Sequence, residues 1–169
     1  MKPQRYIIRL IMETTSMKLP VPLTPLIGRE AEIRQISELL HRDDVCLITL
    51  YGFGGSGKTR LAMEVGHLEA ETFTDGVWFV ALAPLSSPEH ILTATASALG
   101  FDFGNSVDQK KQLFSYLQEK NLLLIFDNVE HLLPNATLFF EEFLQNIPRQ
   151  PKLRLLVTSR QPLNMPWEW

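Results

Sequence analysis

Cysteine is almost missing from this sequence of 169 residues, since Cys46 stands alone. A single cysteine cannot form an internal disulfide, and no CxxC or spaced Cys/His set is present that could hold a structural zinc ion. The sequence also lacks an apolar run of the ~18 residues that a membrane-spanning helix needs, and its start carries no small-residue cleavage site of a secretory signal. These absences predict a protein of the reducing cytoplasm that has no contact with a membrane.

An excess of basic residues is absent as well. Sixteen Lys and Arg stand against nineteen Asp and Glu, so the net charge is −3. This balance argues against a general nucleic-acid-binding face, and we expect no direct contact between this segment and nucleic acid. Hydrophobic residues make up 45% of the chain, which is enough for one core of ordinary size and predicts a single folded domain.

Four short apolar runs recur along the chain: Val45–Tyr51, Val77–Leu82, Leu122–Phe126 and Leu153–Thr158. Their hydrophobicity is continuous rather than alternating, which is typical of parallel strands buried on both faces. Amphipathic helical patterns lie before the first run, over Arg29–His41, and between the others. The alternation predicts an α/β fold of three layers, in which a parallel sheet of at least four strands carries helices on both faces.

The N-terminal stretch has a different character. Pro20, Pro22 and Pro25 fall within six residues and forbid a continuous helix there, because proline lacks a backbone N–H and biases the residue before it toward extended geometry. We therefore predict a flexible leader and linker over residues 1–26 and the folded domain over residues 27–169.

The segment GFGGSGKT, Gly52–Thr59, directly follows the first apolar run and precedes a helical pattern, which is the context that the phosphate-loop motif GxxxxGK[ST] requires. Glycines here let successive backbone N–H groups converge on phosphate oxygens at the start of a helix. Lys58 would reach the β- and γ-phosphates, and the Thr59 hydroxyl would bind Mg²⁺. The alternative is a glycine-rich turn without function. The predicted nucleotide-binding residues are Gly52, Phe53, Gly54, Gly55, Ser56, Gly57, Lys58, Thr59 and Arg60.

An acid follows the third apolar run, at Asp127. A phosphate loop needs such an acid to hold a magnesium-bound water, so we predict Thr59 and Asp127 as the metal site; the alternative is an ordinary buried strand that ends in a polar cap. The next residue is Asn128, whose amide cannot act as a base. Glu130 either takes that role or is only a charge in the following turn. The sequence thus predicts nucleotide binding and leaves open whether Glu130 serves as a base for hydrolysis.

Arg160 follows the fourth run and should lie at the same carboxyl edge of the sheet as the phosphate loop. A guanidinium there can contact the γ-phosphate, although a surface arginine is the alternative. The candidate catalytic residues are therefore Lys58, Asp127, Glu130 and Arg160. The four histidines show no metal-ligand spacing, and we interpret His131, near the same edge, as a structural or surface residue.

Four segments in this order resemble the STAND class of P-loop ATPases, in particular the NB-ARC-like domain of bacterial LuxR-type and SARP-type transcriptional regulators. They are LIGRE (Leu26–Glu30), GFGGSGKTRLA (Gly52–Ala62), LLLIFDNVEHLL (Leu122–Leu133) and LLVTSRQPL (Leu155–Leu163). The resemblance covers about residues 20–169. It implies that the strand carrying Arg160, the first sensor, lies between the phosphate-loop strand and the strand of Asp127. It also implies that the segment Leu26, Ile27, Gly28 and Arg29, with Glu32, lies against the adenine.

The resemblance further implies a nucleotide switch with slow hydrolysis at most. ADP holds it in a closed, inactive form, and exchange for ATP releases it for self-association. Asn128 stands where many relatives have Asp, which suits slow turnover. In such proteins C-terminal lid domains follow the sensor, and we expect them to be missing here. Two alternatives remain. A small-molecule kinase usually has an arginine-rich lid, whereas residues 84–121 hold no arginine. A non-enzymatic interaction module would have lost the nucleotide.

Overall fold

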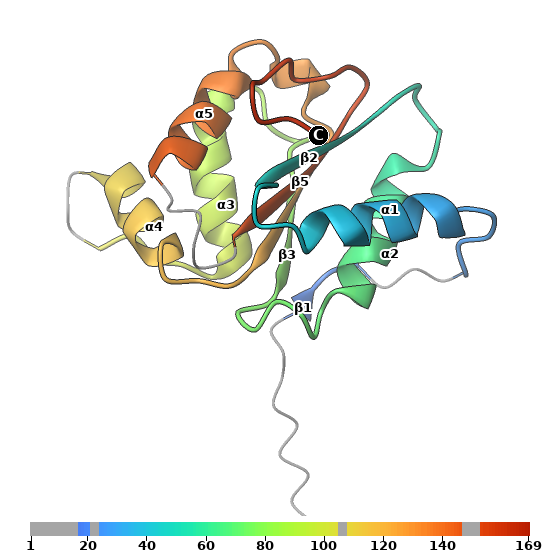
Figure 1. Cartoon of the computed structure of the whole chain (residues 1–169). Coiled ribbons are helices and arrows are strands. Elements are labelled where there is room, and N and C mark those ends of the chain that lie inside the picture. Colours follow the sequence, from blue (N-terminus) through green and yellow to red (C-terminus); the bar gives the residue numbers. More distant parts are fainter. Residues whose placement is uncertain (1–16, 21–23, 105–107, 147–152) are drawn as a thin grey trace, which may run out of the picture.

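The structure is a computed structural model that describes residues 17–20, 24–104, 108–146 and 153–169 (Figure 1). The strands are β1 (Met17–Lys18), β2 (Leu47–Tyr51), β3 (Val77–Ala81), β4 (Leu123–Asp127) and β5 (Arg154–Ser159). The helices are α1 (Glu30–Leu40), α2 (Lys58–Leu68), α3 (Ile91–Leu99), α4 (Gln109–Leu117) and α5 (Ala136–Asn146), with short 3₁₀ turns η1 (Pro88–His90) and η2 (Glu130–Leu132). The four predicted strands are confirmed with ends shifted by one or two residues.

All five strands pair in parallel, in the order β1-β3-β4-β5-β2. Strand β5 therefore lies between the phosphate-loop strand β2 and the acid strand β4, as the resemblance implied. Tyr51 is in register with Ser159, and Ala81 with Asp127. Because parallel strands end at the same edge, the loops after β2, β4 and β5 meet there, which is where open α/β folds bind ligands.

Helices cover both faces of the sheet, which confirms the predicted three layers. Helices α1 and α2 lie on one face and α3, α4 and α5 on the other (Figure 1). The strand β4 shows why its sequence is continuously apolar: Leu123 and Ile125 belong to the core beneath α1 and α2, whereas Leu124 and Phe126 belong to the core beneath α3, α4 and α5. All four of these side chains are buried, so apolar residues do not alternate with polar ones along the strand.

The prediction of a tether through residue 26 is wrong for Met17–Leu19. Met17 pairs with Val77 at the edge of the sheet, and Leu19 is buried in the core beneath α1 and α2. Leu19 packs against Gly66 of α2, where a Cβ would lie 2.8 Å from Leu19 Cδ1. Two strand residues are too few to show a period, and the prolines that suggested a tether come after them. The rest of the predicted leader, residues 1–16 and 21–23, lies outside the described residues.

The outer edge of β2 is covered by the last residues of the chain. The Trp169 N–H donates to Leu47 O at 3.2 Å, and the Thr49 N–H donates to Trp169 O at 2.9 Å. The Arg42 guanidinium lies 4.3 Å from the centre of the Trp169 ring, a cation–π contact. These contacts fix the strand that leads into the phosphate loop on both of its sides.

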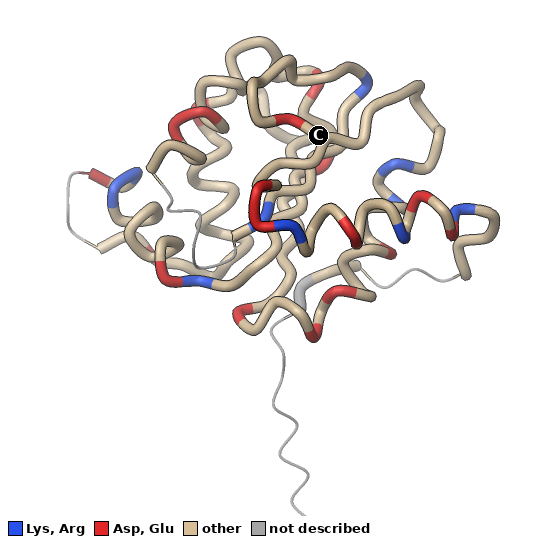
Figure 2. Tube along the Cα trace, viewed as in Figure 1, with Lys and Arg blue, Asp and Glu red and all other residues tan. Residues whose placement is uncertain are grey.

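Charges of both signs are spread over the molecule. In the view of Figure 2, acidic and basic positions of the described residues are interspersed over several helices and loops, and the described basic residues do not gather into one patch. This distribution agrees with the near-neutral composition. Among the described residues, every helix falls short of the length and hydrophobicity needed to cross a bilayer.

Candidate functional site

The loop between β2 and α2 has the backbone of an anion cradle. Gly52, Gly55 and Gly57 have φ angles of +149°, +77° and +84°, in a region that side chains other than glycine strain to adopt. Gly57 is the N-cap of α2, whose first turn has no side-chain cap and no acidic residue. The first N–H groups of the helix are therefore left for an anion, and its positive dipole end points the same way.

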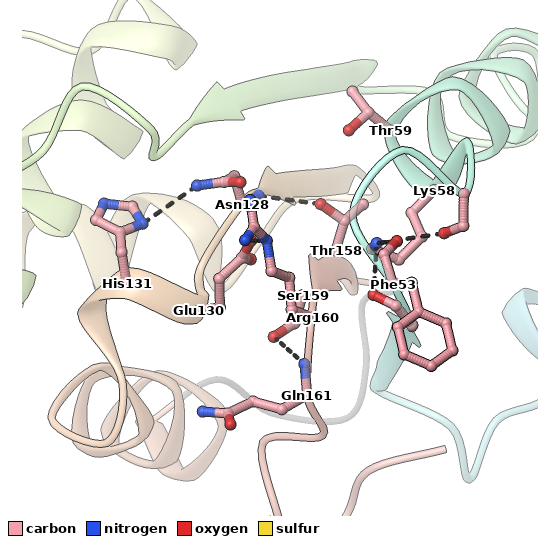
Figure 3. A network of polar contacts seen from close by, with 12 residues as sticks. Phe53, Lys58, Thr59, Asn128, Glu130, His131, Thr158, Ser159, Arg160 and Gln161 are labelled. Atoms are coloured by element: carbon pink, nitrogen blue, oxygen red, sulfur yellow. Dashed lines mark hydrogen bonds and ion pairs between the residues drawn. The ribbon is translucent and has the colours of Figure 1, made fainter.

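Lys58 is folded across this loop. Its Nζ donates to the backbone oxygens of Gly52 at 2.8 Å and Phe53 at 2.9 Å, and it lies 3.4 Å from Ser56 Oγ (Figure 3). The ammonium is thereby held among the loop atoms instead of extending into solvent. A positive charge and convergent N–H groups thus occupy one small region at the start of α2.

The hydroxyl of Thr59 and the carboxylate of Asp127 meet at the other side of the α2 start. Thr59 Oγ1 donates to Asp127 Oδ1 at 2.6 Å. Thr158, at the end of β5, donates to the same oxygen at 2.6 Å, and its own Oγ1 accepts the Asn128 N–H at 3.0 Å. Sequence reasoning missed Thr158, although its place next to the end of the sensor strand could have indicated it.

These oxygen atoms fit Mg²⁺, which prefers hard oxygen ligands and is usually held by one or two carboxylates together with substrate phosphates. Among the described residues, no group of three or more His, Cys, Asp or Glu side chains forms a metal centre by itself. A magnesium ion at Thr59 and Asp127 would therefore complete its shell with phosphate and water oxygens.

Arg160 and Glu130 form an ion pair beside the loop. Arg160 Nε lies 2.9 Å from Glu130 Oε1, with Arg160 largely exposed and Glu130 only 15% exposed. The guanidinium also lies over Gly54, where a Cβ would be 3.7 Å from Arg160 Cζ. The structure thus brings the end of β5, the turn after β4 and the phosphate loop together. Glu130 is engaged with a cation here, which limits its availability as a base.

A cavity of about 370 Å³ joins these parts. It is lined by the loop, the first turns of α2 and the ends of β4 and β5: Gly54, Gly55, Gly57, Lys58, Thr59, Arg60, Met63, Asn128, Glu130, Thr158 and Arg160. A larger cavity, of about 580 Å³, lies between α4 and α5 and contains none of the predicted site residues.

A second cavity of about 370 Å³ lies on the α1 side of the loop, and Lys58 lines both. Arg29 and Glu32 border it: Arg29 donates to Ser56 O at 3.1 Å and to Glu32 Oε1 at 2.7 Å. The hydrogen bond from Arg29 lowers the pKa of the Glu32 carboxyl below its ordinary value. The predicted Ile27 is 83% exposed and, like Gly28, does not line this cavity.

Arg60 connects the site to the N-terminal segment. One of its guanidinium nitrogens donates to Thr24 Oγ1 at 3.3 Å, while its Nε and second terminal nitrogen are buried without a hydrogen-bond partner. Arg60 also lines the first cavity, so this residue links that cavity to the segment of Thr24.

Comparison with known proteins places the chain in a family. The NB-ARC domain model matches residues 29–162. An uncharacterised protein of Mycobacterium tuberculosis is 32% identical over 146 residues, which are 86% of this chain and 36% of that protein. Another protein of the same organism, which carries the name of an HTH-type transcriptional regulator, is 34% identical over 122 residues, 72% of this chain and 13% of that one. Regulatory protein AfsR of Streptomyces coelicolor is 30% identical over 127 residues, 66% of this chain and 13% of that one.

Solved structures agree on the fold. Cdc6p of Pyrobaculum aerophilum superposes with a TM-score of 0.63 at 19% identity, covering 84% of this chain and 41% of that one. The ORC2 protein of Aeropyrum pernix, solved as ADPNP and ADP complexes, gives 0.57 at 20% identity, covering 83% and 42%. The chain spans about a third or less of the curated relatives named above. It has the P-loop ATPase fold and belongs to the NB-ARC domain family.

Proposed function

We propose that this chain is the nucleotide switch of a regulatory ATPase, which binds ATP and ADP with Mg²⁺ and hydrolyses ATP slowly at most. The observation that carries the proposal is the 2.6 Å hydrogen bond between Thr59 and Asp127, two side chains 68 positions apart in the sequence. A nucleotide-bound magnesium ion needs a hydroxyl and a carboxylate together at the start of the helix after the phosphate loop.

The positions of the other site residues suggest what part of the nucleotide each one contacts. The loop N–H groups from Gly52 to Arg60 and the Lys58 ammonium bind the phosphates. Arg160, beside Gly54, contacts the terminal phosphate and distinguishes ATP from ADP. The adenine occupies the second cavity, where Arg29 bonds to the phosphate loop, and the backbone of Ile27 and Gly28 leads into that edge.

Slow hydrolysis follows from the residues after Asp127. Asn128 carries an amide, which cannot take a proton from water. Glu130, the other candidate base, is paired with Arg160 at 2.9 Å. A strong base is therefore lacking among the acids at this edge, which suits a protein whose output depends on which nucleotide is bound.

The relatives indicate the setting. Because proteins such as AfsR are several times longer than this chain, we propose that the switch acts together with C-terminal lid domains and an output domain of a longer cytoplasmic regulator. Self-association in the ATP state would be its active form. Any DNA contact would belong to another segment.

Calorimetric titration of the 169-residue chain with ADP and Mg²⁺ tests the proposal. We expect binding that weakens when Mg²⁺ is chelated and that falls at least about tenfold in Lys58→Ala, because a charge-assisted phosphate contact is lost. Lys111→Ala, an exposed lysine on α4, is the matched control and should bind as the unaltered chain does. Absence of binding, or equal affinity of Lys58→Ala, would overturn the nucleotide role. It would favour the interaction-module alternative.

A further inference from the structure

His131 bridges two loops at the edge of the nucleotide cavity. It lies in η2, directly after β4 and Asn128. Its Nε2 lies 3.0 Å from Leu85 O, in the loop after β3, and its Nδ1 lies 3.2 Å from the side-chain nitrogen of Asn128. Figure 3 shows the imidazole ring and the Asn128 amide lying edge to edge.

The partners of the ring determine where its proton is. A carbonyl oxygen only accepts hydrogen bonds, so His131 Nε2 must carry the hydrogen that it shares with Leu85 O. In the neutral ring Nδ1 is then an acceptor, which matches the N–H donor that Asn128 presents. Each donor thus faces an acceptor, so this tautomer and this amide orientation support each other.

The backbone of Asn128 is held separately. Its φ angle is +67°, a left-handed conformation that Asn tolerates better than most residues, and its N–H donates to Thr158 Oγ1 at 3.0 Å. With the peptide fixed and the amide nitrogen on the histidine, the amide oxygen lies on the other side, toward the phosphate loop (Figure 3). Asn128 lines the cavity together with Lys58 and Thr59.

We propose that His131 is a positioning residue that sets the Asn128 amide so that its oxygen, not its nitrogen, faces the nucleotide cavity. The inference rests on the proposed function, because the cavity must hold a nucleotide for this orientation to have an effect. An amide oxygen accepts a hydrogen bond from a water molecule without removing its proton. The pair therefore orients the attacking water at the place beside Asp127 while leaving it weakly activated.

The ring itself provides the first test. In the nitrogen-15-labelled chain, long-range proton–nitrogen spectra distinguish the two imidazole tautomers, and His131→Gln assigns the signal. We expect the Nε2–H form. We also expect the Asn128 amide signals, assigned with Asn128→Asp, to move when His131 becomes leucine. The Nδ1–H form, or Asn128 signals that do not respond to His131→Leu, would overturn the inference.

Turnover provides the second test. Single-turnover release of phosphate from ATP should fall about tenfold in His131→Leu, the usual size of losing a group that orients a site residue. His131→Gln offers both an amide oxygen for Asn128 and an N–H for Leu85, and we expect it to recover most of the rate. His90→Leu, on η1, is the control and should be unchanged. Equal rates for the leucine and glutamine variants of His131 would contradict a positioning role.

The two proposals fail in different ways. If the nucleotide role is wrong, the unaltered chain binds no ADP in the calorimeter. If the inference is wrong, the unaltered chain and His131→Leu both bind ADP, while the tautomer, the Asn128 signals or the variant rates depart from the stated results. Unfolding curves of His131→Leu and His131→Gln separate a loss of orientation from a loss of fold.

Discussion

The Thr158 hydroxyl donates a 2.6 Å hydrogen bond to Asp127 Oδ1, the atom that also accepts from Thr59. The same hydroxyl accepts the Asn128 N–H. One side chain on β5 therefore fixes both the proposed metal ligand and the peptide after it. The place of β5 between the phosphate-loop strand β2 and the acid strand β4 brings the Thr158 hydroxyl next to the acid.

Replacing this hydroxyl should weaken magnesium-dependent binding. In Thr158→Val the Asp127 carboxylate loses one of its two hydrogen bonds and the Asn128 N–H loses its acceptor, at a cost of about 1–3 kcal/mol in the free energy of unfolding. We expect the ADP affinity in Mg²⁺ to fall about tenfold, as for other residues that orient metal ligands. Calorimetry with and without Mg²⁺ measures the effect. Thr158→Ser keeps the hydroxyl and should restore both stability and affinity; a serine variant as weak as valine would contradict the contact.

Exchanging the amide of Asn128 for a carboxylate should speed hydrolysis. Asp tolerates the left-handed backbone at this position nearly as well as Asn does. A carboxylate beside the attacking water can take its proton, and a positioned general base contributes about 100-fold or more. Single-turnover phosphate release measures the rate. Asn128→Leu should not accelerate the reaction. An Asn128→Asp rate equal to that of the unaltered chain would show that something other than the missing base limits turnover.

The sequence predicts the arrangement of side chains best where they belong to one short segment. The phosphate loop is local: Gly54, Gly55, Gly57, Lys58 and Thr59 fall in one short segment, and they line one cavity. The acid strand was predicted from continuous apolarity, which holds because β4 is buried on both faces. The contacts of Thr158 and His131 could not be predicted in this way, since each depends on which loops the sheet order brings side by side.

Hydrophobicity patterns also failed to predict the edge strand β1 and the burial of Arg154, each for a physical reason. The edge strand β1 has only two residues, too short for a period to show. Arg154 lies inside a run interpreted as apolar and is fully buried, where its guanidinium donates to the backbone oxygens of Leu40 and Arg42 at the end of α1. Carbonyl groups at a helix C-terminus can accept hydrogen bonds from such a buried guanidinium. The sequence around Arg154 gives no sign of these partners, because they lie far away along the chain.

Stability should depend on pH through Asp75, at the edge of the sheet opposite the nucleotide site. Burial raises the pKa of Asp75, but hydrogen bonds from the Asn121 N–H at 2.8 Å and from Lys120 Nζ at 3.0 Å outweigh it, so the pKa is lowered from about 3.8. Because the pKa of Asp75 is lower in the folded chain, its ionised carboxylate stabilises the fold at pH values above its pKa in the unfolded chain. This stabilisation is lost as the pH falls through the pKa that Asp75 has in the folded chain.

Asp75→Asn tests this dependence. Denaturant unfolding should show the variant less stable than the unaltered chain at neutral pH, and the difference should shrink as the pH falls below about 4. The exposed Asp102 gives the control, since Asp102→Asn should shift the curves little at any pH. A difference that stays constant from neutral to acidic pH would mean that the carboxylate charge does not stabilise the fold through these contacts.

The packing of the N-terminal segment on α2 can be tested at Gly66. A Cβ there would lie 2.8 Å from both Ile125 Cδ1 and Leu19 Cδ1 and 3.2 Å from Val77 Cγ1. Alanine is favoured over glycine within a helix by about 1 kcal/mol, whereas overpacking a core costs about 1–3 kcal/mol. Ile125 and Val77 are fully buried in a close-packed core, which leaves their side chains little room to rotate away, so we expect the clash to outweigh the helix preference. We expect Gly66→Ala to lower the free energy of unfolding by about 1 kcal/mol.

Substitution of Leu19 tests whether β1 and the residue after it pack as part of the fold. Leu19→Ala alone should destabilise the chain by about 2 kcal/mol or more, as truncation of a buried leucine does. In that background Gly66→Ala loses one of its two closest clashes, so its cost should shrink or change sign, since the helix preference of alanine remains. Urea unfolding of the two single variants and the double variant gives the coupling. Additive effects would mean that Leu19 does not pack against Gly66 of α2, and residues 17–19 would then belong to the predicted tether.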